Sequence, residues 1–175
     1  MNEVLKAMKE RRSIRAFQPT MPPKADLEQI IEAGLYAPSG KGEQAAIIIA
    51  VTNQDLRDKL AAANAKIGGW KEGFDPFYGA PAVLVVLADK SVPTYLYDGS
   101  LVMGNLLNAA HDVGLGACWI HRAKEVFASE EGKAILRELG VEGDYEGIGN
   151  CIIGYAATPL PEAKPRKEGY VVWAE

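Results

Sequence analysis

Cysteine and histidine are scarce in this 175-residue sequence, which contains two of each. The cysteines, Cys118 and Cys151, lie in the apolar stretches GACWI and NCIIGY. We interpret them as buried, reduced thiols, because a disulfide scaffold needs more cysteines. His111 and His121 together with Cys118 provide at most a C-x-x-H pair and one distant ligand. We therefore predict no metal site.

Long apolar runs and an excess of positive charge are also missing. No stretch approaches the ~20 apolar residues that span a bilayer, and the N-terminal MNEVLKAMKE lacks the apolar core of a signal peptide. The formal net charge of −4 argues against broad binding to nucleic acid or anionic membranes. We expect a cytoplasmic protein with no nucleic-acid or membrane partner, in which any anion site is a local cluster of cations.

Several motifs that would identify a catalytic chemistry are absent. No G-x-G-x-x-G joins a strand to a helix, and neither a G-x-x-x-x-G-K-[ST] phosphate loop nor a G-x-S-x-G elbow occurs. Glu130 and Glu131 look like first-turn helix charges rather than a catalytic carboxylate pair. Cys118 and His121 remain a conceivable nucleophile and base, but three residues apart on a strand they would face opposite sides.

The hydrophobic pattern predicts one domain of alternating helices and strands. Short β-branched apolar runs indicate buried strands, and 3.6-residue periodicity indicates helices. We expect helices over 2–11, 24–37, 55–67, 97–116 and 129–140, and strands over 45–52, 81–89, 117–120 and 148–158. This order is typical of a layered α/β or α+β sheet.

The C-terminal segment has a different character. The stretch PLPEAKPRKEGYVVWAE begins with prolines, which favour an extended chain, and ends in the β-prone run GYVVW. We therefore divide the chain into a domain over 1–157 and an extended arm over 158–175. An arm of this kind is expected to pack on a second subunit, and the largely apolar helix predicted over 97–116 suits a core or an interface.

An unusual cluster of cations occurs in ERRSIRAF, where Arg11, Arg12 and Arg15 surround Ser13. Guanidinium forks match phosphate oxygens, and a serine hydroxyl adds a donor. The alternative is a solvated helix end with Glu10 as partner. A second cluster of Lys164, Arg166 and Lys167 lies on the arm, and the two clusters would converge on one phosphate if the arm folded back.

Two other stretches combine small residues with polar or aromatic ones. The loop APSGKGEQ (37–44) presents Ser39, Lys41 and Gln44 between glycines, which let a backbone approach a ligand closely. The stretch GLGACWIHR puts Trp119 and His121 at the end of a predicted strand, where ligands bind in α/β sheets. A generic loop and a core tryptophan remain the alternatives.

Taken in order, five stretches resemble the landmarks of the nitroreductase-like FMN oxidoreductases: RRSIRAF, APSGKGEQ, APAVLVVLAD, NLLNAAHDVGLGACWI and KPRK. The resemblance covers essentially the whole chain, which would be a short member of that family. It implies an α+β fold with a mixed central β-sheet flanked by helices. It also implies a homodimer that exchanges its C-terminal arms and holds two FMN molecules at the interface.

The resemblance implies a role for each matching residue. Arg11, Ser13 and Arg15 would hold the FMN phosphate and ribityl chain, and Arg12 would lie near the polar edge of the ring. The remaining cofactor-binding positions would be the arm residues Lys164 and Arg166, the loop residues Pro38, Ser39, Gly40 and Gln44 supplied by the partner subunit, and the strand-end residues Cys118, Trp119 and Ile120.

The implied chemistry is redox chemistry of the flavin. NADH or NADPH would pass a hydride to it and leave, and a small electron acceptor would take its place in a ping-pong scheme, so no side chain has to be catalytic. His121 is the one side chain considered as a proton carrier in the acceptor pocket, or else it is a polar strand-end residue. Trp70 and Tyr78, in the glycine-hinged segment 67–81, are predicted to cover the acceptor site, unless this segment is a packed surface loop.

The loop at 37–44 departs from the family pattern, because Gly42 stands where an asparagine is common and Ala45-Ala46 replace a Pro-aromatic pair. We expect an FMN-dependent NAD(P)H oxidoreductase acting on nitroaromatics, quinones or similar acceptors. The alternatives are a specialised reaction on the same fold (enone reduction, dehalogenation or flavin breakdown) and a non-catalytic FMN-binding or sensing protein. The sequence favours neither NADH nor NADPH and does not identify the physiological acceptor.

Overall fold

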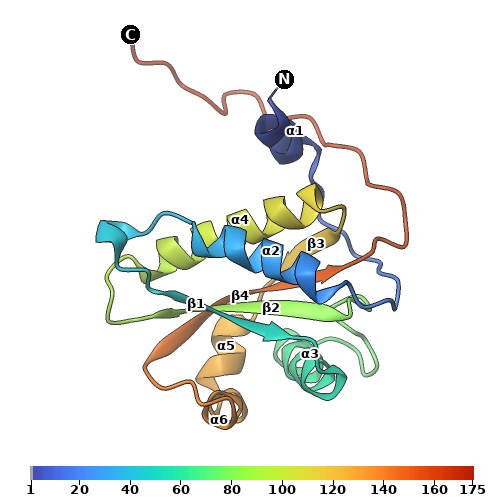
Figure 1. The fold of residues 1–175 in the computed structure, drawn as a ribbon, viewed down its shortest axis with the longest axis vertical. Coiled ribbons are helices and arrows are strands. Elements are labelled where there is room, and N and C mark those ends of the chain that lie inside the picture. Colours follow the sequence, from blue (N-terminus) through green and yellow to red (C-terminus); the bar gives the residue numbers. More distant parts are fainter. Residues whose placement is uncertain (1) are drawn as a thin grey trace.

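A four-stranded sheet runs through the centre of the computed structural model, which describes residues 2–175 (Figure 1). The strand order is β1-β2-β4-β3. The strands are β1 (Ala46–Val51), β2 (Ala82–Asp89), β3 (Gly116–Ile120) and β4 (Tyr145–Gly154). β1 and β3 therefore form the two edges, and β2 and β4 lie between them.

The sheet is antiparallel, which corrects the expectation of a mixed sheet. β1 pairs with β2, β2 with β4 and β3 with β4, each antiparallel. Parallel pairing among the described residues is confined to an isolated bridge between Ser13 and Ala117, at the outer edge of β3. The mixed sheet was implied by the family resemblance, and the strand pattern could not correct it. A strand that is apolar on both faces looks the same in a parallel sheet as in an antiparallel sheet covered by helices on both sides.

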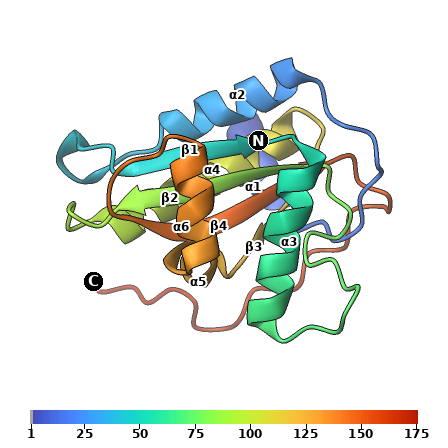
Figure 2. The ribbon, with the colours of Figure 1, turned by 90° about the horizontal axis from the view of Figure 1, so that it is seen from below.

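Helices cover both faces of the sheet (Figures 1 and 2). α2 (Lys24–Leu35) and α4 (Tyr95–Asp112) lie on one face. α3 (Gln54–Gly68), α5 (Ala123–Ala128) and α6 (Glu130–Glu138) lie on the other. Within residues 2–175, no helix combines the length and hydropathy needed to cross a membrane.

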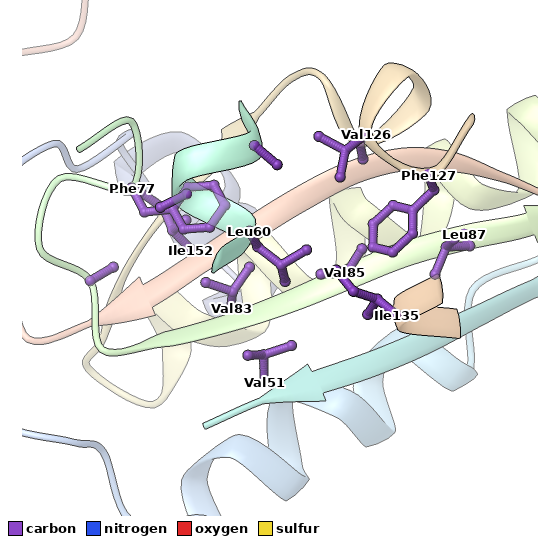
Figure 3. Packing of buried hydrophobic residues seen from close by; sticks show 14 of the residues in the cluster. Val51, Leu60, Phe77, Val83, Val85, Leu87, Val126, Phe127, Ile135 and Ile152 are labelled. Atoms are coloured by element: carbon purple, nitrogen blue, oxygen red, sulfur yellow. The ribbon is translucent and has the colours of Figure 1, made fainter. Parts of the chain in front are cut away.

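β2 shows how alternating side chains supply two cores. Val83, Val85 and Leu87 point toward α3, α5 and α6, where they pack with Leu60 and Phe127 (Figure 3). Leu84, Val86 and their alternate neighbours pack on α2 and α4 instead. Every one of these β2 side chains is fully buried, so the strand is one continuous hydrophobic run from Ala82 to Ala88.

The predicted helices and strands are confirmed with shifts at their ends. The helix expected over 97–116 begins at Tyr95 and ends at Asp112, because Gly114 adopts φ +81° and turns the chain into β3. The strand expected over 148–158 begins at Tyr145 and ends at Gly154. Helix α5 was not predicted, since its six residues are too few to show a helical period.

The two ends of the chain leave apolar surface uncovered. α1 (Glu3–Glu10) has no buried residue, and Val4, Leu5 and Met8 are each more than half exposed. The C-terminal arm, residues 158–175, is extended and runs away from the end of β4 (Figures 1 and 2). Its run GYVVW forms no strand with the described residues, contrary to the β-prone pattern, because a strand must pair with a sheet edge and the arm runs away from the sheet (Figure 1).

Candidate functional site

The arginine segment, residues 11–15, follows α1 and runs along the outer edge of β3. The backbone N–H of Ile14 donates to the carbonyl oxygen of Ala117 at 3.1 Å. The Ile14 side chain is 2% exposed and packs directly against Gly116, where an added Cβ would lie 2.9 Å from it. This anchor leaves Arg11, Arg12 and Ser13 half-buried and Arg15 exposed beside the sheet edge.

Two of these arginines carry buried nitrogen atoms without partners. Arg11 Nη1 and Arg12 Nε have no hydrogen-bond partner among residues 2–175. Arg12 is held by its other end, since its Nη1 donates to the carbonyl oxygens of Lys9 and Arg11 at 2.7 Å each. The helix-end alternative is supported in part, since Arg11 caps the C-terminus of α1 and Arg12 donates to the last-turn carbonyl of Lys9, but no Glu10 carboxylate among residues 2–175 pairs with these guanidinium groups. Buried cationic donors without acceptors are costly, and they fit an anionic ligand.

The buried thiol of Cys151, on β4, lies near enough to Arg11 to be affected by its charge. Burial raises the pKa of Cys151 strongly, the neighbouring Cys118 raises it further, and the positive charge of Arg11 lowers it in part. The thiol therefore stays protonated and serves as core. Cys118 is 1% exposed and packs in the core cluster on the α3 side, so only its backbone is available to a ligand.

A groove of about 500 Å³ opens at the end of β3. We call it the β3 groove; it is lined by Tyr95, Leu96, Ser100, Trp119, His121, Arg122, Lys124, Glu125, Glu146, Gly147 and Ile148. Trp119 Nε1 is buried with no partner among the residues described. A Cβ on Gly149 would lie 2.3 Å from this nitrogen, so glycine is needed for the indole to lie flat against β4. The predicted Trp119 and His121 thus share one groove, with Ile120 beside them.

The chain leaves β3 in a tightly fixed turn. Asn64 Nδ2, from α3, donates to the carbonyl oxygen of His121 at 2.7 Å. Asn150 Nδ2, from β4, lies 3.4 Å from the carbonyl oxygens of Ile120 and His121. Both amides are 2% exposed, and Arg122 follows with φ +81°. The sequence analysis missed both asparagines, although each is a polar residue in an otherwise apolar run.

The serine loop, residues 37–44, is held by a buried carboxylate that the sequence analysis also missed. Asp98, in the first turn of α4, is 3% exposed. Its two oxygens accept hydrogen bonds from the Gly40 N–H at 3.0 Å and the Thr94 hydroxyl at 2.9 Å. The signal was a lone acidic residue in the apolar stretch YLYDGSLVM, and the helix N-terminus stabilises its charge.

The serine loop presents its predicted residues around a small cavity of about 180 Å³. Pro38, Ser39 and Gln44 line this cavity, and the Ser39 hydroxyl accepts from the Gln44 N–H at 3.1 Å. Gln44 and Lys41 have φ of 50° and 53°, a conformation that costs a non-glycine residue free energy and is common at ligand sites. The loop therefore holds a strained but well-anchored conformation beside this cavity.

The structure does not bring the serine loop and the arginine segment together within one chain. The loop precedes Ala46, which pairs with Ala88 at one end of the β1 edge. The arginine segment lies beside Ala117, at the other end of the β3 edge. Strand spacing and rise put these points roughly 25 Å apart, and Figures 1 and 2 show them on opposite sides of the molecule.

The arm begins beside the residues that follow the arginine segment, where the Ala157 N–H donates to the Ala16 carbonyl oxygen at 2.9 Å. Its cations Lys164 and Arg166 lie further along and are exposed, and Arg166 Nη2 donates to the Lys164 carbonyl oxygen at 2.6 Å. Their convergence on one phosphate stays a prediction.

The segment 67–81 lies on the α3 side of the sheet. Trp70 stacks at 4.9 Å on Phe74, and Phe74 meets Tyr78 edge-on at 5.9 Å. The segment is fastened by Asp75, whose carboxylate pairs with Arg57. Trp70 lines a separate cavity of about 490 Å³ over α3, and the β3 groove contains no residue of this segment. The acceptor-site role of Trp70 and Tyr78 stays a prediction.

Comparison with known proteins agrees with this arrangement. The nitroreductase family model matches residues 8–155. A protein of Archaeoglobus fulgidus, provisionally named an NADH dehydrogenase/NAD(P)H nitroreductase, is 31% identical over 97% of this chain and 91% of its own length. Crystal structures of nitroreductases with bound FMN from Bacteroides fragilis and Desulfitobacterium hafniense match with TM-scores of 0.89, at 30% and 29% identity over 100% of both chains.

Proposed function

The chain belongs to the nitroreductase family, and on this premise we propose that it is an FMN-dependent NAD(P)H oxidoreductase. Its substrates would be nitroaromatics, quinones or related small electron acceptors. Bound FMN supplies the redox chemistry, taking a hydride from NADH or NADPH and reducing the acceptor in a ping-pong sequence. The two similar crystal structures contain FMN, and the named relatives include an FMN reductase of Bacillus subtilis. The protein's own part is binding, orientation and electrostatics.

One observation carries the proposal: buried donors beside β3 that lack acceptors. Arg11 Nη1 and Arg12 Nε are cationic, and Trp119 Nε1 lies in the adjoining groove. A flavin mononucleotide has a phosphate for Arg11 and a planar ring with polar edges for Arg12 and Trp119. We assign Arg11, Ser13 and Arg15 to the phosphate and ribityl chain. Arg12 and the β3 groove are assigned to the ring.

These residues act on the redox reaction through charge. Electron density added to the ring is stabilised by cationic and amide donors that are already in position. The Arg12 guanidinium is fixed by the carbonyl oxygens of Lys9 and Arg11, so it needs little reorganisation. His121 lies exposed on the groove wall and is the candidate for proton delivery to the acceptor.

We further propose that the working form is a homodimer in which each site takes residues from both copies. The serine loop and the arginine segment lie on opposite sides of one chain, so one copy offers only one half of each site. In a two-fold symmetric dimer, the serine loop of each copy can lie against the arginine segment of the other, so two equal sites form. The uncovered apolar residues of α1 and the exposed arm, including Trp173 at 81% exposure, supply apolar surface for such an interface.

The proposal is tested by recording the visible spectrum of the purified protein and then adding NADH or NADPH without oxygen. We expect a flavin band near ~450 nm that is bleached by at least one nucleotide. A screen of nitroaromatics, quinones, enones and halogenated aromatics then separates general reduction from a specialised reaction. Flavin that binds tightly but is not bleached would mean a binding protein, and a protein that cannot bind FMN would contradict the proposal.

A further inference from the structure

Two buried amides converge on the peptide that ends β3, and neither belongs to the surface that the ligand would touch. Asn64 reaches it from α3 at 2.7 Å, and Asn150 reaches it from β4 at 3.4 Å. Each is 2% exposed. A buried amide without partners is costly, so Asn64 is held to the carbonyl oxygen of His121, and Asn150 is shared between this oxygen and that of Ile120.

Fixing this carbonyl also fixes the opposite side of the same peptide. The peptide between His121 and Arg122 is trans, so its C=O and N–H point in opposite directions. Because the asparagines hold the carbonyl oxygen toward the core, the Arg122 N–H faces outward. Residues 2–175 offer this N–H no acceptor. His121 and Arg122 both line the β3 groove.

The backbone at Arg122 is held in an unfavourable conformation by its surroundings. Arg122 has φ +81°, which a non-glycine residue adopts only when its surroundings impose it. The Asn64 bond is the short one of the two, and it comes from a different element than the sheet. The Asn64 bond is therefore the stronger of the two contacts that fix the position of this turn at the β3 groove.

We propose that Asn64 is a positioning residue for the flavin ring. It holds the His121–Arg122 peptide so that an N–H donor and the side chains of Trp119 and His121 keep their places in the β3 groove. This inference rests on the proposed function, because the groove must hold the ring. An outward N–H donor stabilises the electron-rich reduced ring more than the oxidised one. Loss of Asn64 is then expected to weaken FMN binding and to make the midpoint potential of the bound flavin more negative.

The test compares Asn64→Ala with Asn105→Ala. Asn105 is a matched control because its Nδ2 also donates to one backbone carbonyl, that of Ala33, at 2.9 Å, but it joins α4 to α2. Both variants lose one amide-to-carbonyl bond, so both should lower the melting temperature by a similar amount. FMN affinity is measured by quenching of flavin fluorescence, and the midpoint potential by anaerobic titration with a reference dye.

We expect Asn64→Ala to raise the Kd for FMN roughly fivefold and to shift the potential downward, with Asn105→Ala like the wild type in both. Equal Kd and potential in all three proteins would overturn the positioning role. A wild-type protein that binds no FMN would instead overturn the proposed function. If Asn64→Ala does not fold, Asn64→Ser replaces it; serine is too short to reach the carbonyl, so the same shifts are expected.

Discussion

The arginine segment and the serine loop, the two halves of the proposed FMN site, differ in how their polar groups are paired. The arginine segment offers charged side chains whose buried nitrogens Arg11 Nη1 and Arg12 Nε lack partners. The serine loop has its polar groups already satisfied, through Asp98 and Ser39. In the proposed site, the FMN phosphate would supply the acceptors that the first region needs, and the second region would contribute a surface whose polar groups are already paired. Because one chain holds the two regions apart, the proposal requires two chains to complete each site.

Removing a charge from the arginine segment should have the largest effect. We expect Arg11→Ala to raise the Kd for FMN about 10- to 100-fold, since it deletes a charge-assisted bond to the phosphate. Arg137→Ala, at an exposed arginine in the last turn of α6, changes net charge equally and is the control. Flavin fluorescence titration measures both. An Arg11 effect no larger than the Arg137 effect would mean that the phosphate binds elsewhere.

Disturbing the serine loop should weaken FMN binding through shape rather than charge. A Cβ on Gly40 would lie 2.3 Å from Thr94 Oγ1, so Gly40→Ala must displace either the loop or the Thr94–Asp98 contact. We expect a loss of about 1–3 kcal/mol in the free energy of unfolding and FMN binding about tenfold weaker, because one half of each site is displaced. Urea unfolding and flavin titration measure the two.

The control for that variant is Gly132→Ala. Its Cβ would lie 2.1 Å from the carbonyl oxygen of Val126, which is remote from the serine loop and joins α5 to α6. The Gly132→Ala protein should lose at least as much stability as the Gly40→Ala protein, while its FMN affinity in the folded state is unchanged. Equal losses of affinity in both variants would show that general destabilisation, and not the loop, is responsible.

The arm cations should make a smaller, salt-sensitive contribution to FMN affinity, because they are proposed to meet the same phosphate as the arginine segment. Replacing both Lys164 and Arg166 by Gln should raise the Kd for FMN about three- to fivefold at low salt, and most of this difference should disappear at ~0.5 M salt because exposed charges are screened. Titrations at two salt concentrations measure it. An effect that is independent of salt, or none at either salt, would contradict convergence of the arm on the phosphate.

The smallest effect on FMN binding is expected at Cys151, whose buried thiol contributes to stability and not to the ligand. Burial raises the pKa of Cys151 above its unfolded value of about 8.5. The folded protein therefore keeps the full contribution of this neutral thiol below about pH 8.5 and loses it, by up to ~1.4 kcal/mol per pH unit, as pH rises toward the folded pKa. Cys151→Ala should show a shallower loss of stability between about pH 8.5 and 10. Parallel pH profiles for the two proteins would contradict a buried neutral thiol.

Much of this architecture was readable from the sequence, because periodicity reports burial directly. The buried strand at 81–89 and the helices around it follow from runs such as PAVLVVLAD. Pairing direction did not follow, since a strand that is buried on both faces has the same pattern in parallel and antiparallel sheets. The run GYVVW was equally ambiguous, because β propensity describes a side chain's fit to a sheet and not the presence of an edge.

The candidate-site residues were predictable where they are clustered or exposed residues of a distinctive type. The buried polar residues that hold the backbone of the site in place were not. The arginines stand out in an acidic chain, and Trp119 stands at a strand end. Asn64, Asn150 and Asp98 were missed because each acts on a backbone atom far away in the sequence. Their common signal is a single polar residue in an apolar run, which becomes informative only when the fold supplies its partner.

The central claim is that each site is shared between two copies, and mixing two defective proteins tests it most directly. The Arg11→Ala and Gly40→Ala proteins are unfolded together, refolded and assayed for FMN bound per chain. Random pairing makes half of the dimers hybrids, each with one intact and one doubly altered site, so we predict recovery of about one quarter of the wild-type sites with native affinity. Recovery of none, with each protein still folded and paired, would contradict a shared site.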